Sequence, residues 1–169
     1  MNGHMIAILV KNKYGVLNRI TSMFRRRQFN ISSLTVSETE SAERSRITIL
    51  FPGEEERKEQ LVNQLYKLPD VISIKELAPE LAVHREVLLI KVENAPKSRD
   101  DLKAAADAFG AKIVDYARDS VMYQMTGDSR SIDDFIELMR DHNILEICRT
   151  GIVALERGNT TITGGELNI

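Results

Sequence analysis

The chain has 169 residues, with 23 Lys and Arg against 25 Asp and Glu, and a formal net charge of −2 at pH 7. A hydrophobic share of 43% beside 28% charged residues excludes the polar, highly charged class of disordered chains, and the length suits one large domain or two small ones. The near-zero charge argues against nucleic acid or an anionic membrane as a partner of the whole molecule, and no apolar run approaches the roughly 18 residues of a membrane-spanning helix.

An apolar segment, Met5 to Val10, comes first and is typical of a strand covered on both faces. No basic leader or small-residue cleavage site accompanies it, so we interpret it as a strand and not as a signal peptide. Hydrophobic periodicity then predicts a helix, two strands, a helix and a strand, with a bulge in the first of the two strands. These elements lie at 16–24, 29–36, 47–51, 61–68 and 72–74.

The same βαββαβ order occurs again in the second half of the chain. Ser98, with Asp101 three residues later, resembles a capping box for one helix, and Ser131 with Asp134 opens another. The expected elements lie at 87–92, 98–109, 113–116, 121–125 and 131–139, with 144–147 and 152–155 as the last extended segment.

The repeated order predicts an α+β fold of two tandem ferredoxin-like βαββαβ domains, each a four-stranded antiparallel sheet with two helices on one face. Because a unit of roughly 80 residues buries only about 60% of its unfolded surface, we expect the chain to form a homodimer or a higher oligomer. The expected division is a first domain at 1–78, a linker at 79–84, a second domain at 85–158 and a polar tail at 159–169.

The segment from Asn12 to Leu17 has a local pattern with functional geometry. A strand ends there, the chain turns, and Gly15 opens a helix whose first amides have no acceptor within the helix. Such a helix N-terminus binds a carboxylate or phosphate, and an Asn side chain can accept from an ammonium group and donate to a carboxylate. The segment therefore suits a small zwitterion. In the simpler interpretation, Gly15 only makes a turn and Asn12 only caps the helix.

Asn30 stands at the start of the second predicted strand, where Asn is usually a turn residue that tolerates unusual backbone angles. We hypothesise that two copies of the chain pair edge to edge, so that Asn30 of one copy approaches the Gly15 loop of the other.

The remaining reactive residue types form no catalytic or metal-binding pattern. The three histidines, His4, His84 and His142, lack the spacing of zinc ligands. Cys148 lies in an apolar strand, which favours a small buried residue over a nucleophile, and a lone cysteine fits a reducing cytoplasm. The basic run 25–27 is interpreted as a solvated helix end or the rim of a protein interface. We therefore predict no catalytic residue and no metal site.

The sequence NKYGVLNRITSMFRRRQFNISSLTV, from Asn12 to Val36, resembles the N-terminal ACT domain of the small, regulatory subunit of acetolactate synthase. Further similar stretches follow in order across both halves of the chain. They are RSRITI at 44–49, KLPDVISIKEL at 67–77, REVLLIKV at 85–92, AKIVD at 111–115, TGD at 126–128 and ILEICRTGIVALERG at 144–158.

This resemblance implies a non-catalytic chain that binds and activates a separate catalytic large subunit. In the family that partner uses thiamine diphosphate, a divalent metal such as Mg²⁺ and usually FAD to condense 2-oxo acids, so no cofactor is expected on this chain. The family also confers feedback inhibition by valine or another branched-chain amino acid bound between two ACT domains. The resemblance places that effector site on Asn12, Gly15 and Asn30, with Val16, Leu17 and Ile31 as neighbours.

The chain departs from the family pattern at Gln28, where Gly is common, at Ser32, where Glu is frequent, and at Pro69 and Gly110. The first two lie near the implied site and can change the effector preference. Two other functions compete with the regulatory one: an ACT-type sensor for some other enzyme or a transcription factor, and a stand-alone enzyme on a ferredoxin-like scaffold.

Overall fold

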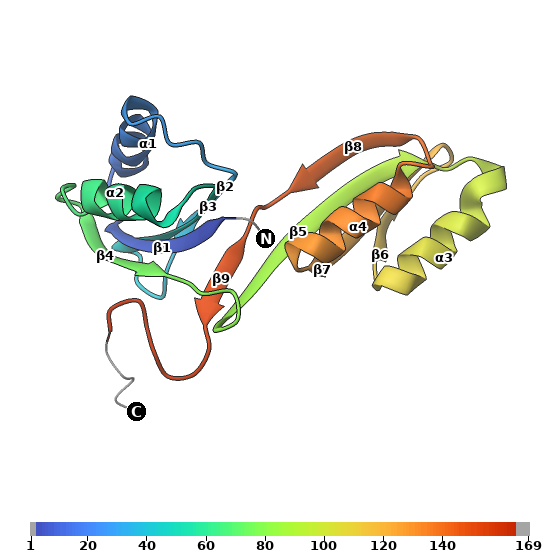
Figure 1. The fold of residues 1–169 in the computed structure, drawn as a ribbon. Helices are drawn as coiled ribbons and strands as arrows, with labels where there is room; N and C mark the ends of the chain where they lie inside the picture. Colours follow the sequence, from blue (N-terminus) through green and yellow to red (C-terminus); the bar gives the residue numbers. More distant parts are fainter. Residues whose placement is uncertain (1–2, 165–169) are drawn as a thin grey trace. The chain divides into compact units, whose positions relative to one another are not determined.

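The computed structural model describes residues 3–164, which form two compact units, drawn as ribbons in Figure 1. The first unit contains residues 3–84 and 152–164, and the second contains residues 85–151. In chain order the elements are β1 (His4–Lys11), α1 (Val16–Arg26), β2 (Ser33–Glu38), β3 (Arg44–Phe51), α2 (Glu55–Leu65), β4 (Val71–Glu76), β5 (Ala82–Glu93), a 3₁₀ turn (Pro96–Ser98), α3 (Arg99–Phe109), β6 (Lys112–Tyr116), β7 (Ser120–Gly127), α4 (Ser129–Met139), β8 (Ile144–Arg149) and β9 (Val153–Glu156).

The first unit is built on an antiparallel sheet with the strand order β2-β3-β1-β4. Helices α1 and α2 lie on the same face of this sheet (Figure 1). Because strand side chains alternate between faces, every second residue of β1 and β3 points toward the helices and is buried against them. The fully buried members of this core are Ile6, Ile8, Ile20, Ile47, Ile49, Phe51, Leu61 and Leu65.

Helix α1 ends in a Schellman motif centred on Gln28, which adopts the left-handed conformation with φ of 56°. The amide of Phe29 donates to the carbonyl of Phe24 at 2.9 Å, and the amide of Gln28 donates to the carbonyl of Arg25 at 3.2 Å. Phe29 is buried, so the motif directs the chain back onto the core before β2 begins.

The second unit repeats the arrangement, with the strand order β6-β7-β5-β8 and helices α3 and α4 packed on the sheet. Inside it, Glu86 is buried and pairs with Arg149, whose Nη2 and Nε lie 2.8 Å and 3.0 Å from the Glu86 Oε2. The side chain of Ser129 also contacts the Glu86 carboxylate.

The two sheets confirm the predicted α+β fold of tandem ferredoxin-like units.

Strand β9 belongs to the first unit, although it follows the second unit in sequence. It pairs with β5, whose first residues 82–84 also lie in the first unit. The apolar side chains of Ile152 and Ala154 cover Met5 and Ala7 on the sheet face that carries no helix. The Ser33 hydroxyl accepts from the Ile152 amide at 3.0 Å. The compact units therefore differ from the predicted division, which placed 85–158 in one domain; the end of the predicted tail, 165–169, lies outside the described residues.

Several local predictions were wrong. Segment 29–32 is not a strand; β2 begins at Ser33. Ser98 makes no capping hydrogen bond, because the chain enters α3 through a 3₁₀ turn and the Ser98 hydroxyl bonds to Ala95 instead. Helix α4 is capped by Asp128, whose carboxylate accepts from the Ser131 amide at 2.8 Å. Cys148 is exposed, because its side chain points to the face of the second sheet opposite the helices, where it lies across from Leu89.

Candidate functional site

The turn between β1 and α1 leaves the start of the helix open. Gly15 is the N-cap residue and has a φ of 79°, in the left-handed region that favours glycine. A Cβ at Gly15 would find only the Arg19 Nη1 nearby, at 3.6 Å, so the backbone angle and not crowding is the reason for glycine. No side chain caps α1 and no acidic residue lies in its first turn, whereas α2 carries Glu55 and Glu56 at the corresponding place. Among the described residues, the positive end of α1 therefore has no capping side chain and no acidic residue in its own first turn.

Asn12 does not cap the helix, which excludes the simpler interpretation of this residue. Its Nδ2 donates to the Glu38 carboxylate at 3.1 Å and to the Ala42 carbonyl at 2.9 Å, and its backbone amide donates to the Glu43 carbonyl at 2.7 Å. These contacts tie the turn to the hairpin between β2 and β3. Both side-chain hydrogen bonds of Asn12 use its Nδ2. Its Oδ1 accepts no hydrogen bond within residues 3–164, so this oxygen can accept one from an ammonium group.

The two apolar residues after Gly15 have different roles. Val16 is buried in the core of the first unit and cannot present its side chain to a ligand. The side chain of Leu17 is 39% exposed and that of Tyr14 is fully exposed, so Leu17 offers apolar surface beside the helix N-terminus.

Asn30 and Ile31 lie at the other end of the first sheet. They precede β2, whose Ser33 is paired with Leu50 of β3, and Leu50 is paired in turn with Met5 near the start of β1. Asn12 follows the opposite end of β1. Met5 and Lys11 are six residues apart, which is about 20 Å along a strand. One copy of the chain therefore brings Asn12, Gly15 and Leu17 together but does not bring Asn30 to them.

The cluster of His4, Glu55 and Glu76 has ligand atoms close enough to hold a metal ion. Lys58 already occupies it, because its ammonium contacts both carboxylates. The hydrogen bonds that the Lys58 ammonium donates to Glu55 and Glu76 raise the pKa of Lys58. Desolvation alone would raise the pKa of Glu76, but hydrogen bonds from Lys58 and His4 outweigh it and hold that pKa below its usual value. The cluster is an ion-pair network with its own cation and does not favour a metal.

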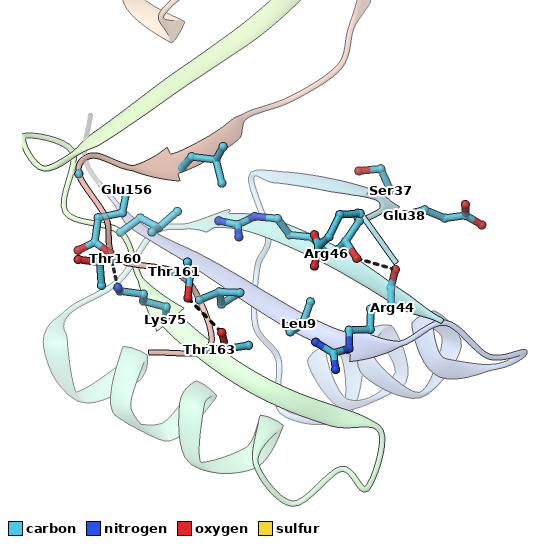
Figure 2. Close-up of a pocket in the computed structure, with 16 residues that line it drawn as sticks. Leu9, Ser37, Glu38, Arg44, Arg46, Lys75, Glu156, Thr160, Thr161 and Thr163 are labelled. Atoms are coloured by element: carbon cyan, nitrogen blue, oxygen red, sulfur yellow. Dashed lines mark hydrogen bonds and ion pairs between the residues drawn. The ribbon is translucent and has the colours of Figure 1, made fainter. Parts of the chain in front are cut away.

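A cavity of about 790 Å³ that the sequence did not predict lies between the helix-free face of the first sheet and the segment 155–163 (Figure 2). The sheet contributes Leu9, Arg44, Arg46 and Lys75, and the segment contributes Leu155, Glu156 and several threonines. Because these two walls are far apart in sequence, no local pattern in either one signals the cavity.

Comparisons with known proteins match both halves of the chain. Residues 6–73 match the family described as the AHAS small subunit-like ACT domain, and residues 85–158 match the family described as the small subunit of acetolactate synthase. The chain is 46% identical over 156 residues to a probable acetolactate synthase small subunit of Archaeoglobus fulgidus, covering 92% of this chain and 98% of that protein. It is 44% identical over 155 residues to the acetolactate synthase small subunit of Bacillus subtilis, covering 91% of this chain and 90% of that protein.

The fold agrees with these matches. The crystal structure of the acetolactate synthase small subunit from Thermotoga maritima superimposes with a TM-score of 0.87 at 37% identity, covering 94% of this chain and 99% of that one. Among the described residues, no helix is both long and apolar enough to span a membrane.

Proposed function

The chain belongs to the acetolactate synthase small-subunit family, and from this membership we propose that it activates a catalytic large subunit and makes that enzyme sensitive to feedback inhibition by valine or a related branched-chain amino acid. The thiamine diphosphate, Mg²⁺ and FAD of the reaction would reside on the large subunit. This chain would supply the effector site and the change in assembly that transmits effector binding.

The single observation that carries the proposal is the open N-terminus of α1. Gly15, in its left-handed conformation, lets a ligand approach the amides of Leu17 and Asn18, for which no described side chain competes; the amide of Val16 already donates to the Lys13 carbonyl at 3.3 Å. Amides at a helix N-terminus together with the positive dipole end bind a carboxylate. The free Oδ1 of Asn12 would accept from the ammonium group of the same amino acid, and the exposed part of Leu17 would contact its apolar side chain.

The edge of the first sheet supports a site shared by two copies. Strand β2 pairs only with β3 among the described strands, so it is an edge strand that a second strand can join. If β2 of one copy pairs antiparallel with β2 of a second copy, the start of one strand lies beside the end of the other. Asn30 precedes the start of β2, and Glu38, which accepts from Asn12, ends it. Such a dimer would bring Asn30 and Ile31 of one copy to the Asn12 turn of the other.

Shared construction would couple effector binding to the arrangement of the dimer. An amino acid that contacts both copies binds most tightly in the one arrangement that brings its two sets of contacts together, and it shifts the population toward that arrangement. A catalytic partner that prefers a different arrangement would then lose activation, and by reciprocity it would weaken effector binding.

Calorimetric titration of the full chain with valine, leucine and isoleucine tests the site, beside assays of large-subunit activity with and without effector. We expect Asn12→Ala and Gly15→Asp to abolish effector binding and inhibition while activation persists. Asn63→Ala, on the exposed surface of α2, serves as the matched control and should bind as the wild type does.

Wild-type affinity in both Asn12→Ala and Gly15→Asp would refute the site. Failure of the chain to co-purify with the large subunit or to stimulate its rate would refute the activating role, and turnover of pyruvate by the isolated chain would show that it is an enzyme in its own right.

A further inference from the structure

The cavity on the helix-free face of the first sheet is bounded on one side by the C-terminal segment, which specific contacts hold in place. The Arg46 Nη2 donates to the Ala154 carbonyl at 2.8 Å, the ammonium of Lys75 pairs with the carboxylate of Glu156, and the Ser73 hydroxyl donates to the Ile162 carbonyl at 2.6 Å. These contacts hold the segment over the sheet while a space of about 790 Å³ remains between them. That volume lies within the usual range of small-molecule sites.

Arg46 is the unusual group in the cavity wall. It lies on β3, between Ser37 of β2 and Leu9 of β1, and it forms no ion pair with any carboxylate of the described chain. Its Nε is buried and has no hydrogen-bond partner within the same residues. Burial lowers the pKa of Arg46. The cavity wall therefore contains a guanidinium that lacks an anion. Because a desolvated charge is costly unless it is paired, binding of an anion beside Arg46 would be favourable.

The other charges of the cavity do not supply that anion. Glu156 is neutralised by Lys75, and Glu38 is bonded to Asn12. The side chain of Glu38 also points away from Arg46 in Figure 2. Glu40 is exposed at the rim, where Arg44 adds a second guanidinium without an ion pair among the described residues. The unpaired charge inside the cavity is therefore positive.

Apolar side chains in the rest of the wall can contact the uncharged part of a ligand. Leu9 and Leu77 line the sheet side, and Leu155 and Ile162 line the opposite side. Figure 2 shows Leu9 and Arg46 on the sheet, facing the segment that carries Thr160, Thr161 and Thr163. A ligand inside the cavity meets the guanidinium of Arg46 and an apolar surface large enough for a short alkyl chain.

We propose that this cavity binds a small carboxylate with a short apolar chain, held at its charged end by Arg46 with Arg44 at the rim. The inference does not depend on the valine site, because the lining residues come from the opposite face of the sheet and from residues 155–163. The charged end would complete the hydrogen bonding of the guanidinium, whose planar donors match a carboxylate.

Calorimetric titration of the full chain with sodium butyrate, acetate and inorganic phosphate at constant ionic strength tests the proposal. We expect saturable binding of butyrate, weaker binding of acetate and none of phosphate, because only butyrate engages both the cation and the apolar wall. Arg46→Gln should weaken butyrate binding at least tenfold, the effect of losing a hydrogen bond to a charged group. Arg25→Gln, an exposed change on α1, should leave it unchanged.

A second variant separates binding from folding, because Arg46→Gln also removes the hydrogen bond to Ala154. Leu155 is 64% exposed, so Leu155→Trp places a larger ring at the apolar wall without removing buried contacts, and it should weaken butyrate binding in a folded chain. Gly15→Asp, which changes no residue of the cavity wall, should bind butyrate normally even if it loses valine. Absence of saturable butyrate binding, equal binding of phosphate, or wild-type binding by both Arg46→Gln and Leu155→Trp would overturn the proposal.

Discussion

Replacing Gln28 with Gly should stabilise the protein, although it removes a side chain. Gln28 is the one described non-glycine residue with positive φ, at 56°, and it occupies the position after the helix end where the Schellman motif favours glycine. Its side chain is exposed, and its carbonyl, which accepts from the Arg57 Nη2 at 3.1 Å, is retained in the variant. The substitution therefore removes backbone strain and no buried contact.

The size of the effect follows from two opposing contributions. The left-handed conformation costs a residue with a Cβ about 1–2 kcal/mol. Removing the Cβ relieves this cost. Glycine also has more conformational freedom in the unfolded chain, and this greater entropy offsets about 0.5–1 kcal/mol of the stabilisation. The net stabilisation is about 0.5–1 kcal/mol, which corresponds to a rise in melting temperature of about 1–4 °C for a chain of this size.

Thermal and urea denaturation, followed by far-ultraviolet circular dichroism, measure this difference. Arg27→Gly is the matched control, because Arg27 is the exposed neighbour with a φ of −101°, where glycine has no conformational advantage. It should lower stability by about 0.5–1 kcal/mol. The reasoning would be refuted if Gln28→Gly were no more stable than the wild type, or if both glycine variants shifted stability in the same direction.

Two further predictions concern the ion pairs. Arg149→Met should destabilise the second unit by about 3 kcal/mol in urea denaturation, because it leaves the buried Glu86 carboxylate unpaired; Arg140→Met, which breaks an exposed pair with Glu137, should cost less than about 1 kcal/mol. Because the folded-state pKa of Glu76 is lowered, its contribution is present above the ordinary Glu pKa of about 4.3 and is lost as the pH falls below it. As the pH is lowered from 7, the melting temperature of Glu76→Gln should therefore fall less steeply below about pH 4.3 than that of the wild type. Parallel curves of melting temperature against pH would show that the ion pairs of Glu76 do not stabilise the protein.

Local patterns were sufficient for most of the fold. Apolar residues at helical spacing, such as Val16 and Ile20, and alternating ones, such as Ile47 and Ile49, each define a buried face from neighbours in sequence. The turn at Gly15 could also be predicted from the sequence, because a glycine between a strand and a helix indicates a backbone angle that few other residues adopt. Helix starts were predicted less accurately: the sequence pattern indicated Ser98 and Ser131, but Ser98 makes no capping hydrogen bond and Asp128 caps α4, because the path of the preceding chain decides which side chain reaches the first amides.

The pattern of a strand shows that one face is buried but does not show what covers it. Ile152 and Ala154 alternate as any strand does, yet they cover the first sheet, while Cys148, a few residues earlier, is exposed on the second. The bond from Asn12 to Glu38 and the unpaired guanidinium of Arg46 likewise depend on segments brought together across long loops. The sequence by itself determined the elements, their order and the open helix start, because these are short-range properties. The tertiary structure alone decided which segment covers each sheet face and where a cavity remains, because those depend on packing between distant residues.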